Sequence, residues 1–399
     1  MLNIFYSQTL SGCEAEIFNT LNKTRAQNVK HVIFTPDRCN QQTERQLFEL
    51  LNNSCYFDVS VNTLTRFTSQ VISKHKINQK VLTKPLGIAI IKKILNENEK
   101  DLKTFKKAIK FNGFSATLFD TIAMFKSCGV NVDKLNITTN NESLNLKLAD
   151  IKLVYEKYEE FLGNEWTDSF NKLNLLTKIL DKSDCENTHF YFLGFDDFTP
   201  QMYEIIAKLS KLALSCSVAT AVNYIDGINN KNLYLNNVYL NLLSLAEYNG
   251  VKINKIYCPL KLNSTFGFLS KNLLGYSNAK AENHNLISVY KFNNILDEVK
   301  FATKTILNLC LKNNLSFDDF AIIVPDLLQY KNYIKNEFEK NNITYFFDES
   351  EPIGSNIVLR FYFDLFNLLN NNFLKVDVFN FLFNYTNIDK NQLFNYQNI

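Results

Sequence analysis

Residues Ser7 to Glu14 read Ser-Gln-Thr-Leu-Ser-Gly-Cys-Glu and follow a short apolar segment at the N-terminus. A loop between a strand and a helix can bind nucleotide phosphates if it supplies glycines, a lysine and a Ser or Thr hydroxyl for magnesium. Here only Gly12 is kept, Cys13 stands where the lysine belongs, and Glu14 stands where the hydroxyl belongs. A carboxylate at Glu14 would repel phosphates in a partly dry site. We therefore interpret Ser7, Gly12, Cys13 and Glu14 as a degenerate nucleotide loop.

A second candidate is the acidic and aromatic turn Gly194-Phe195-Asp196-Asp197-Phe198-Thr199-Pro200-Gln201, which follows the apolar run Phe190 to Leu193. The ends of buried strands are where α/β proteins keep their sites. Asp196 and Asp197 could be ligands, or they could form the turn and cap the helix that follows. The sequence leaves both interpretations open.

Other catalytic arrangements find little support. The eight cysteines are scattered singly, which favours reduced, buried thiols over disulfides or zinc. The triplet Asp150-Ile151-Lys152 lies in a helical pattern and cannot present its acid and lysine as a pair of strands would. The histidines have no motif around them. We expect no catalytic residue and no metal site in this chain.

The elements that would position these residues alternate between strand and helix. The pattern predicts strands at Leu2–Tyr6, His31–Thr35, Phe57–Val61, Phe190–Leu193 and Ala213–Ala219, with helices between them. Because whole strands are apolar, they are expected to be covered on both faces. The fold class is therefore α/β, with a parallel sheet.

Several segments of the sequence together resemble a known family, AddB, which is called RexB in some bacteria. AddB is the second subunit of a bacterial helicase-nuclease that processes broken DNA ends. The resemblance extends over most of the chain and depends on the order and spacing of several segments. These are Val32 to Asp37 with Glu44, Thr63 to Phe67, Leu146 to Ile151 with Tyr155 and Tyr158, Gly194 to Gln201, Asp297 to Val299, Phe317 to Val324, and Ile343 to Asp348.

The resemblance implies a RecA-like, superfamily 1 helicase-like core of the P-loop NTPase type. A working helicase carries an Asp-Glu pair at the end of a core strand, but Leu193 and Gly194 occupy that place. The family's nuclease is of the PD-(D/E)XK type and lies in a C-terminal domain, with magnesium and an iron–sulfur cluster. No ligands for either are found here, so no cofactor is expected in this portion.

In such proteins single-stranded DNA crosses the end of the sheet, held by phosphate contacts and by stacked aromatic side chains. The DNA-contact candidates follow three strands: Arg38 and Asn40; Leu64, Arg66 and Phe67; Phe195 and Phe198. These three loops should converge on one face. The resemblance implies that this surface reads the recombination sequence Chi, with Arg66 and Phe195 at matching positions. Leu64 and Ser69 stand where the family often has aromatic residues.

These candidates also have structural alternatives. Phe195 and Phe198 could form a packed turn under the following helix. Arg66 could pair with Asp37 or Glu44. The lysine-rich segment Lys103 to Lys110 is most simply one polar face of a helix, although a basic arm along DNA is the alternative.

The predicted organisation has four parts. Residues 1–74 are the first part of the RecA-like core, 75–185 are a helical insertion of the 1B type, and 186–275 return to the core. Residues 276–399 begin a second RecA-like domain, with strands expected at Leu286–Phe292 and Phe320–Val324 and no closing strand. The chain thus reads as an N-terminal portion of something longer, or as a naturally short relative.

Composition agrees with a cytoplasmic protein. The net charge of +3 is too small to indicate nucleic-acid binding unless the positive charge is clustered. The N-terminus has no secretion signal, and no apolar run could span a bilayer.

These observations predict a catalytically silent helicase-like subunit. It would bind single-stranded DNA at broken ends and dock on an AddA-type motor and nuclease, within an ATP-dependent complex that serves recombinational repair. Two alternatives are a divergent P-loop ATPase and an adaptor that does not bind DNA.

Overall fold

The computed structural model describes most of the chain in two compact units, residues 1–286 and 287–399. Described are residues 1–7, 9–51, 56–111, 113–135, 139–163, 165–222, 233–259, 286–349 and 356–386, with positions 266, 268–269, 280 and 354. Gln8 of the predicted nucleotide loop and nearly all of the predicted linker 275–285 lie outside these residues.

The first unit is built on a parallel sheet that has six strands in the described residues, in the order β3-β2-β6-β7-β1-β8. The strands are β1 (Leu2–Ser7), β2 (Lys30–Phe34), β3 (Val59–Asn62), β6 (Thr188–Phe192), β7 (Ser215–Ala221) and β8 (Ile253–Tyr257). The predicted α/β class with a parallel sheet is confirmed. The strand β8 was not predicted, because its alternating pattern leaves much of it exposed at the edge.

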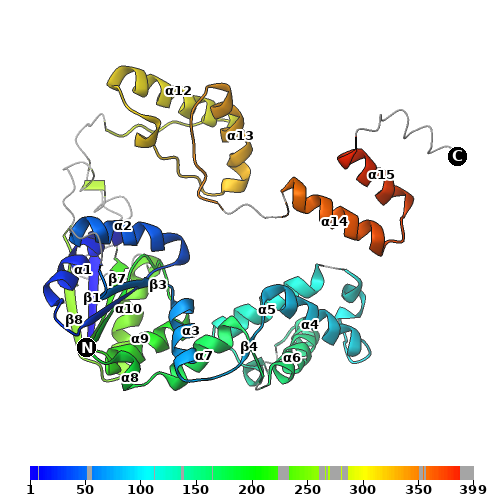
Figure 1. Cartoon of the computed structure of the whole chain (residues 1–399), viewed down its shortest axis with the longest axis horizontal. Helices are drawn as coiled ribbons and strands as arrows, with labels where there is room; N and C mark the ends of the chain where they lie inside the picture. The colour runs from blue at the N-terminus through cyan, green and yellow to red at the C-terminus, as the bar shows by residue number, and fades with distance from the viewer. Residues whose placement is uncertain are drawn as a thin grey trace. The chain divides into compact units, whose positions relative to one another are not determined.

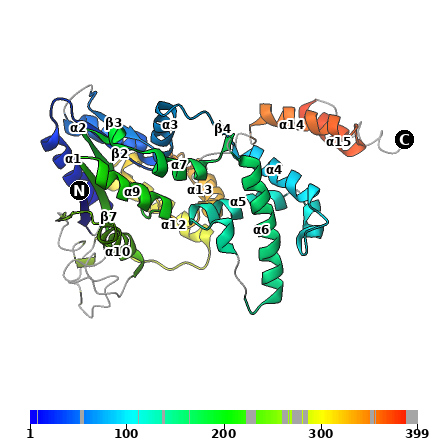
Figure 2. The same ribbon diagram turned by 90° about the horizontal axis from the view of Figure 1, so that it is seen from below.

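Helices cover both faces of the sheet (Figures 1 and 2). One face packs against α1 (Leu10–Thr24) and α2 (Asn40–Leu51) through a core that includes Phe5, Ile33 and Tyr191. The other packs against α3 (Leu64–Lys74), α7 (Ser169–Ile179), α9 (Pro200–Leu212) and α10 (Leu233–Tyr248). Burial on both faces explains why entire strands are apolar.

Between α3 and α7 the chain forms a separate helical body. Two short parallel strands, β4 (Lys80–Val81) and β5 (Trp166–Thr167), pair where this segment begins and ends. We call the segment from β4 to β5 the helical insertion. It contains α4 (Lys84–Glu97), η2 (Phe105–Lys110), α5 (Phe114–Ser127), η3 (Val132–Leu135) and α6 (Glu142–Leu162), and it has its own apolar core.

The helix expected over the lysine-rich segment Lys103 to Lys110 is instead a 3₁₀ helix, η2, over Phe105–Lys110. The physical reason is a contact distant in sequence. The buried carboxylate of Asp150, on α6, accepts hydrogen bonds from the backbone N–H groups of Lys103, Thr104 and Phe105 at 2.8, 2.7 and 3.0 Å. These bonds satisfy the N–H groups of Lys103, Thr104 and Phe105 without a preceding helical turn, so the helical segment begins only at Phe105.

The second unit contains α12 (Ile295–Asn313), η5 (Phe317–Asp319), α13 (Leu327–Lys340), α14 (Ile357–Asn370) and α15 (Lys375–Tyr385). A small core joins α12 and α13 through Val299, Ile306, Ile334 and Phe338. The strands expected at Leu286–Phe292 and Phe320–Val324 are not formed. Val289 and Ile323 are 92% and 94% exposed. No described residues of this unit form a strand beside these segments, and unpaired strands are unstable in water.

Among the described helices none combines the length and the apolar character needed to cross a bilayer.

Candidate nucleic-acid interface

Three loops meet at one end of the sheet because β3, β2 and β6 are adjacent and parallel. Phe34, the last residue of β2, lies opposite Asn62 of β3 and Phe192 of β6. The connection continues beyond the strands, since the Leu193 N–H donates to the Phe34 carbonyl at 2.9 Å and the Thr35 N–H donates to the Asn62 carbonyl at 3.2 Å. The predicted convergence of the loops that follow these strands is therefore present.

The loop after β2 presents Arg38 on the surface, within the short turn η1 (Asp37–Cys39). Its guanidinium donates to Asp196 of the β6 loop at 3.5 Å. The two side chains are 68% and 78% exposed, and an ion pair this open to water contributes little energy. Arg38 is therefore held only weakly by Asp196.

Gly194 makes the turn after β6, next to the loop that follows β2. Its φ of +73° is in the left-handed region, which favours glycine, and the loop lies in ordinary contact range of Pro36 and Cys39. Asn40 lies beside this contact and accepts a hydrogen bond from the Thr35 hydroxyl at 2.5 Å. This bond orients the Asn40 amide at the start of α2.

The loop after β3 divides its candidates between core and surface. Leu64 and Phe67 are buried, and the Phe67 ring lies edge-on to Phe34 with the ring centroids 5.1 Å apart. Arg66 is exposed on the first turn of α3, which Thr63 caps. In the described part of the chain Arg66 forms no ion pair, and both Asp37 and Glu44 belong to that part.

The loop after β6 divides in the same way. Phe198 is only 5% exposed, and its ring packs on Phe192 and Tyr203. Phe195 is half-buried and lies 5.3 Å from Phe198, ring centroid to ring centroid. Phe198 thus belongs to the packed turn, and Phe195, which also packs on Phe192, is only partly buried.

Of the two acidic residues in this loop, Asp197 stabilises the loop itself and Asp196 does not. The Asp197 carboxylate accepts the Phe198 N–H at 2.7 Å and so forms the turn. The cap of α9 is Thr199, whose hydroxyl accepts the Met202 N–H. Asp196 is exposed and faces Arg38.

The degenerate nucleotide loop lies elsewhere on the same edge, between β1 and β7. The chain runs from β1 to β2 in one direction along the sheet and from β7 to β8 in the other direction. Parallel sheets bind ligands at the place where neighbouring strands have connections in opposite directions, which here lies between β1 and β7. Only Gln8 and Thr9 separate β1 from α1. Gly12, Cys13 and Glu14 are therefore already helical and do not form a cradle.

The Cys13 thiol lies at the end of the sheet beside β7, where the nucleotide loop was predicted. It donates weakly to the Thr220 carbonyl of β7 at 3.7 Å and is fully buried. A hydrogen bond with Cys258 and burial raise the pKa of the Cys13 thiol, and burial raises the pKa of the Glu14 carboxyl. The nearby Ser7 hydroxyl is buried without a hydrogen-bond partner in the described residues. These groups offer no positive charge to a phosphate.

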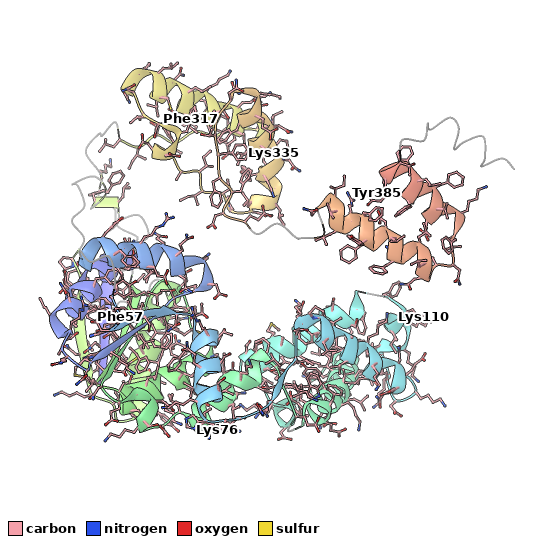
Figure 3. All side chains as sticks on the ribbon, viewed as in Figure 1. Phe57, Lys76, Lys110, Phe317, Lys335 and Tyr385 are labelled. Atoms are coloured by element: carbon pink, nitrogen blue, oxygen red, sulfur yellow. The ribbon has the colours of Figure 1, made fainter. Side chains whose placement is uncertain are left out.

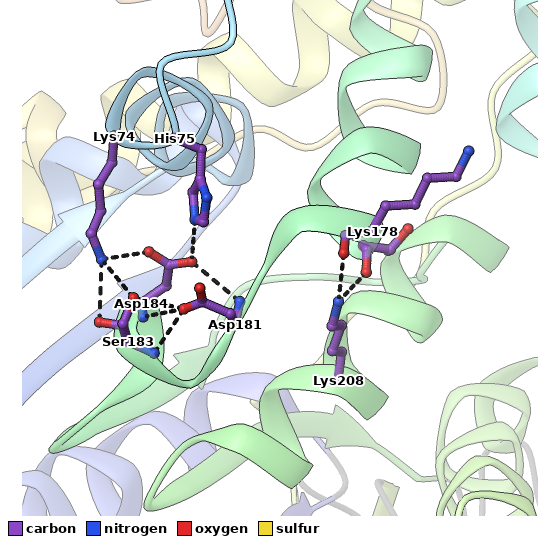
Figure 4. Close-up of polar contacts among 8 residues, drawn as sticks. Lys74, His75, Lys178, Asp181, Ser183, Asp184 and Lys208 are labelled. Atoms are coloured by element: carbon purple, nitrogen blue, oxygen red, sulfur yellow. Dashed lines mark hydrogen bonds and ion pairs between the residues drawn. The ribbon is translucent and has the colours of Figure 1, made fainter.

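Sequence reasoning missed a polar cluster at the neck of the helical insertion (Figure 4). The buried Asp184 carboxylate, on α8 (Lys182–Cys185), lies 2.6 Å from Lys74 Nζ and 2.9 Å from His75 Nε2. Lys208 Nζ donates to the carbonyls of Thr177 and Lys178 at the end of α7. The bonds to Asp184 join elements more than a hundred residues apart, so no local pattern could reveal them.

His75, Asp181 and Asp184 are the one group in the described residues whose donor atoms could share a metal ion. The Lys74 ammonium already occupies one oxygen of Asp184, and Asp181 accepts the N–H groups of Ser183 and Asp184 as a helix cap. Because these groups are satisfied and one is a cation, the arrangement fits a structural clamp better than a metal site.

Asp150, the acid of the triplet considered for a nuclease, is in the helix α6 as predicted. Its two oxygens accept three backbone N–H groups, so they anchor η2.

Comparison with known proteins gives a consistent result. The family model described as "ADDB, N-terminal" matches residues 8–272. Relatives named as the B subunit of an ATP-dependent helicase/deoxyribonuclease are similar over nearly the whole chain. The Clostridium botulinum (strain Hall) protein is 25% identical over 96% of this chain and 35% of its own length. The Caldanaerobacter subterraneus protein is 27% identical over 98% and 36%, respectively. The chain thus spans about a third of the length of these relatives.

Proposed function

This chain belongs to the ADDB N-terminal family, and we propose that it is the helicase-like portion of the B subunit of an ATP-dependent helicase/deoxyribonuclease. Its role in the proposal is to bind single-stranded DNA at the edge formed by β3, β2 and β6. The observation that carries the proposal is the convergence of the loops with exposed Arg38, exposed Arg66 and partly buried Phe195, which follow three adjacent strand ends.

The proposed division of labour follows from burial. Arg38 and Arg66 contact phosphates, and Phe195 stacks on a base, which is the combination that single-strand binders use. Leu64, Phe67 and Phe198 are buried and act by fixing the loops in place. Asn40 has its amide oriented by Thr35 and supplies a polar contact. In the proposal this face also reads Chi, through Arg66 and Phe195, which occupy the matching positions.

We further propose that the RecA-like core has lost ATP chemistry. The sheet order and the position of Cys13 between β1 and β7 support a core of this type. The buried thiol and the neighbouring carboxyl favour neither phosphate nor magnesium. Motor and nuclease activity in the complex would then come from an AddA-type partner and from segments outside this chain. Any magnesium or iron–sulfur cluster would be held in those segments.

The test is fluorescence anisotropy with a labelled single-stranded oligonucleotide over a salt titration. The proteins are wild type, Arg38→Ala, Arg66→Ala and Phe195→Ala, with Arg45→Ala, on the outward part of α2, as the matched control. Losses in the three interface variants but not in the control support the proposal. A flattened salt dependence is expected for the two arginine variants only.

Equal binding by all variants would overturn the proposed face. An absence of binding by wild type at low salt would favour an adaptor function for this chain. Tight binding of ATP would favour the divergent ATPase.

A further inference from the structure

A cluster of lysines on the helical insertion is not used by the proposed interface. Lys103, Lys106, Lys107 and Lys110 are all exposed, and no acidic residue interrupts residues 102–111. Within the described residues none of the four forms an ion pair. Phe111, which follows directly, is 70% exposed. We call these five residues the basic arm; Figure 3 labels Lys110 within it.

The basic arm is held firmly by its inner side. Asp150 accepts the N–H groups of Lys103, Thr104 and Phe105. The Phe105 ring packs on Phe114, with the ring centroids 5.0 Å apart, and Ile109 packs on the core of the insertion. The ammonium groups are therefore carried by an anchored turn, which lowers the entropy lost when they bind a ligand.

The geometry of η2 places charges in a row. In a 3₁₀ helix residues three apart lie on the same side, so Lys107 and Lys110 share a side, with about 6 Å of rise between them. Like charges this close repel each other in the free protein. A polyanion that runs along the row removes this repulsion and releases its own counterions.

We propose that the basic arm binds the phosphodiester backbone of a nucleic acid strand, as a second contact outside the sheet edge. The inference rests on the proposed DNA-binding function but uses none of its residues. Exposed Phe111 beside the lysines offers a ring for base stacking, so a single strand is expected to bind better than a duplex of the same length.

The test compares two four-lysine variants of the full chain. The arm variant carries Lys103→Gln, Lys106→Gln, Lys107→Gln and Lys110→Gln. The control variant removes the same charge elsewhere on the first unit, at the exposed residues Lys23, Lys178, Lys252 and Lys255. Anisotropy is measured with labelled single-stranded and duplex oligonucleotides over a salt titration, and circular dichroism confirms that both variants fold.

The arm variant is expected to bind the single strand at least about tenfold more weakly at low salt, with a salt slope reduced by roughly 0.7 for each phosphate that the arm no longer neutralises. Phe111→Ala should weaken single-strand binding and leave duplex binding unchanged. Equal losses in the arm and control variants would show only a general charge effect and would overturn the proposal. A larger loss on the duplex would overturn the single-strand preference.

The outcomes separate this inference from the proposed function. If Arg38→Ala and Arg66→Ala lose binding and the arm variant does not, the arm is excluded and the sheet edge stands. If the arm variant loses binding and the arginine variants do not, the sheet edge is excluded and the arm stands. If wild type does not bind either oligonucleotide at low salt, both are overturned for this chain.

Discussion

Asp184 accepts a hydrogen bond from His75 across the neck of the helical insertion, with Oδ2 and Nε2 2.9 Å apart. His75 follows α3, where the chain leaves the sheet, and Asp184 precedes β6, where the chain returns to it. Lys74 binds the other oxygen of the same carboxylate at 2.6 Å. The two crossings between sheet and insertion are thus fastened to each other by one buried acid.

The first prediction concerns this buried acid. Asp184→Asn should lower the free energy of unfolding by about 1–3 kcal/mol, because the charge-assisted bonds to Lys74 and His75 are lost. Urea denaturation at pH 7 measures the change. Glu186→Gln, a nearby exposed acid, is the control and should have little effect. Equal stability of Asp184→Asn and wild type would show that the clamp contributes nothing.

The clamp also predicts an acid limit. Burial alone would raise the pKa of the Asp184 carboxyl, but hydrogen bonds from Lys74 and His75 outweigh it and hold the pKa below its ordinary value of 3.8. A carboxyl with a lowered pKa stabilises the fold above its unfolded pKa, and the contribution is lost as pH falls through the folded value. The deficit of Asp184→Asn should therefore shrink below about pH 4.

A second pH effect is expected from His31, which is buried on β2 between β3 and β6. Burial, with a smaller effect of His189, lowers the pKa of His31 to about 4. The unfolded chain takes up this proton near pH 6.5 and the folded chain does not, so stability should fall from pH 6.5 towards 4 by roughly 3 kcal/mol in the limit. His31→Gln should show a shallower decline in urea denaturation at pH 7, 6 and 5. Parallel declines would mean that other groups cause it.

Substitution of the two phenylalanines after β6 should have different effects: Phe198→Ala should mainly lower stability, and Phe195→Ala should mainly weaken binding of the single strand. Phe198→Ala removes a buried ring and should cost about 3–5 kcal/mol of stability. Phe195→Ala removes a half-exposed ring, so it should cost much less and yet weaken single-strand binding. Thermal unfolding and anisotropy on the same samples give both quantities. A variant of Phe195 that unfolds as readily as Phe198→Ala would assign this ring to packing alone.

The degenerate nucleotide loop predicts that ATP does not change the thermal stability of this chain. Because Cys13 and Glu14 offer no cation, millimolar ATP with magnesium should leave the melting temperature of wild type unchanged. A ligand at 100 times its Kd would stabilise the fold by about 2.7 kcal/mol, which such a measurement resolves easily. A melting temperature that rises with ATP concentration would contradict the degenerate interpretation.

Much of the first unit was predictable because its signals are local. An apolar run such as Phe190 to Phe192, bounded by turn residues and followed by a helical pattern, favours a strand covered on both faces, and parallel strands bring their following loops to one end of the sheet. The order of strands and loops along the chain was therefore enough to predict that the loops carrying Arg38, Arg66 and Phe195 lie at the same end of the sheet. The pairing of β2 with β3 and β6, which makes these loops neighbours, came only from the tertiary structure. The residue types at Cys13 and Glu14 were likewise enough to predict that the first loop lacks the chemistry of a phosphate-binding loop.

Tertiary structure decided what depends on partners distant in the chain. Phe198 is buried and Phe195 is only partly buried, although both are phenylalanines of the same loop. Asp150 on α6 anchors the start of the lysine segment, and Asp184 meets His75 across 109 positions. The apolar segment Phe320–Val324 has no strand beside it in the described residues, and a strand is stable only beside another strand. Local periodicity fixes which face of an element is apolar, but only packing determines which neighbour covers that face.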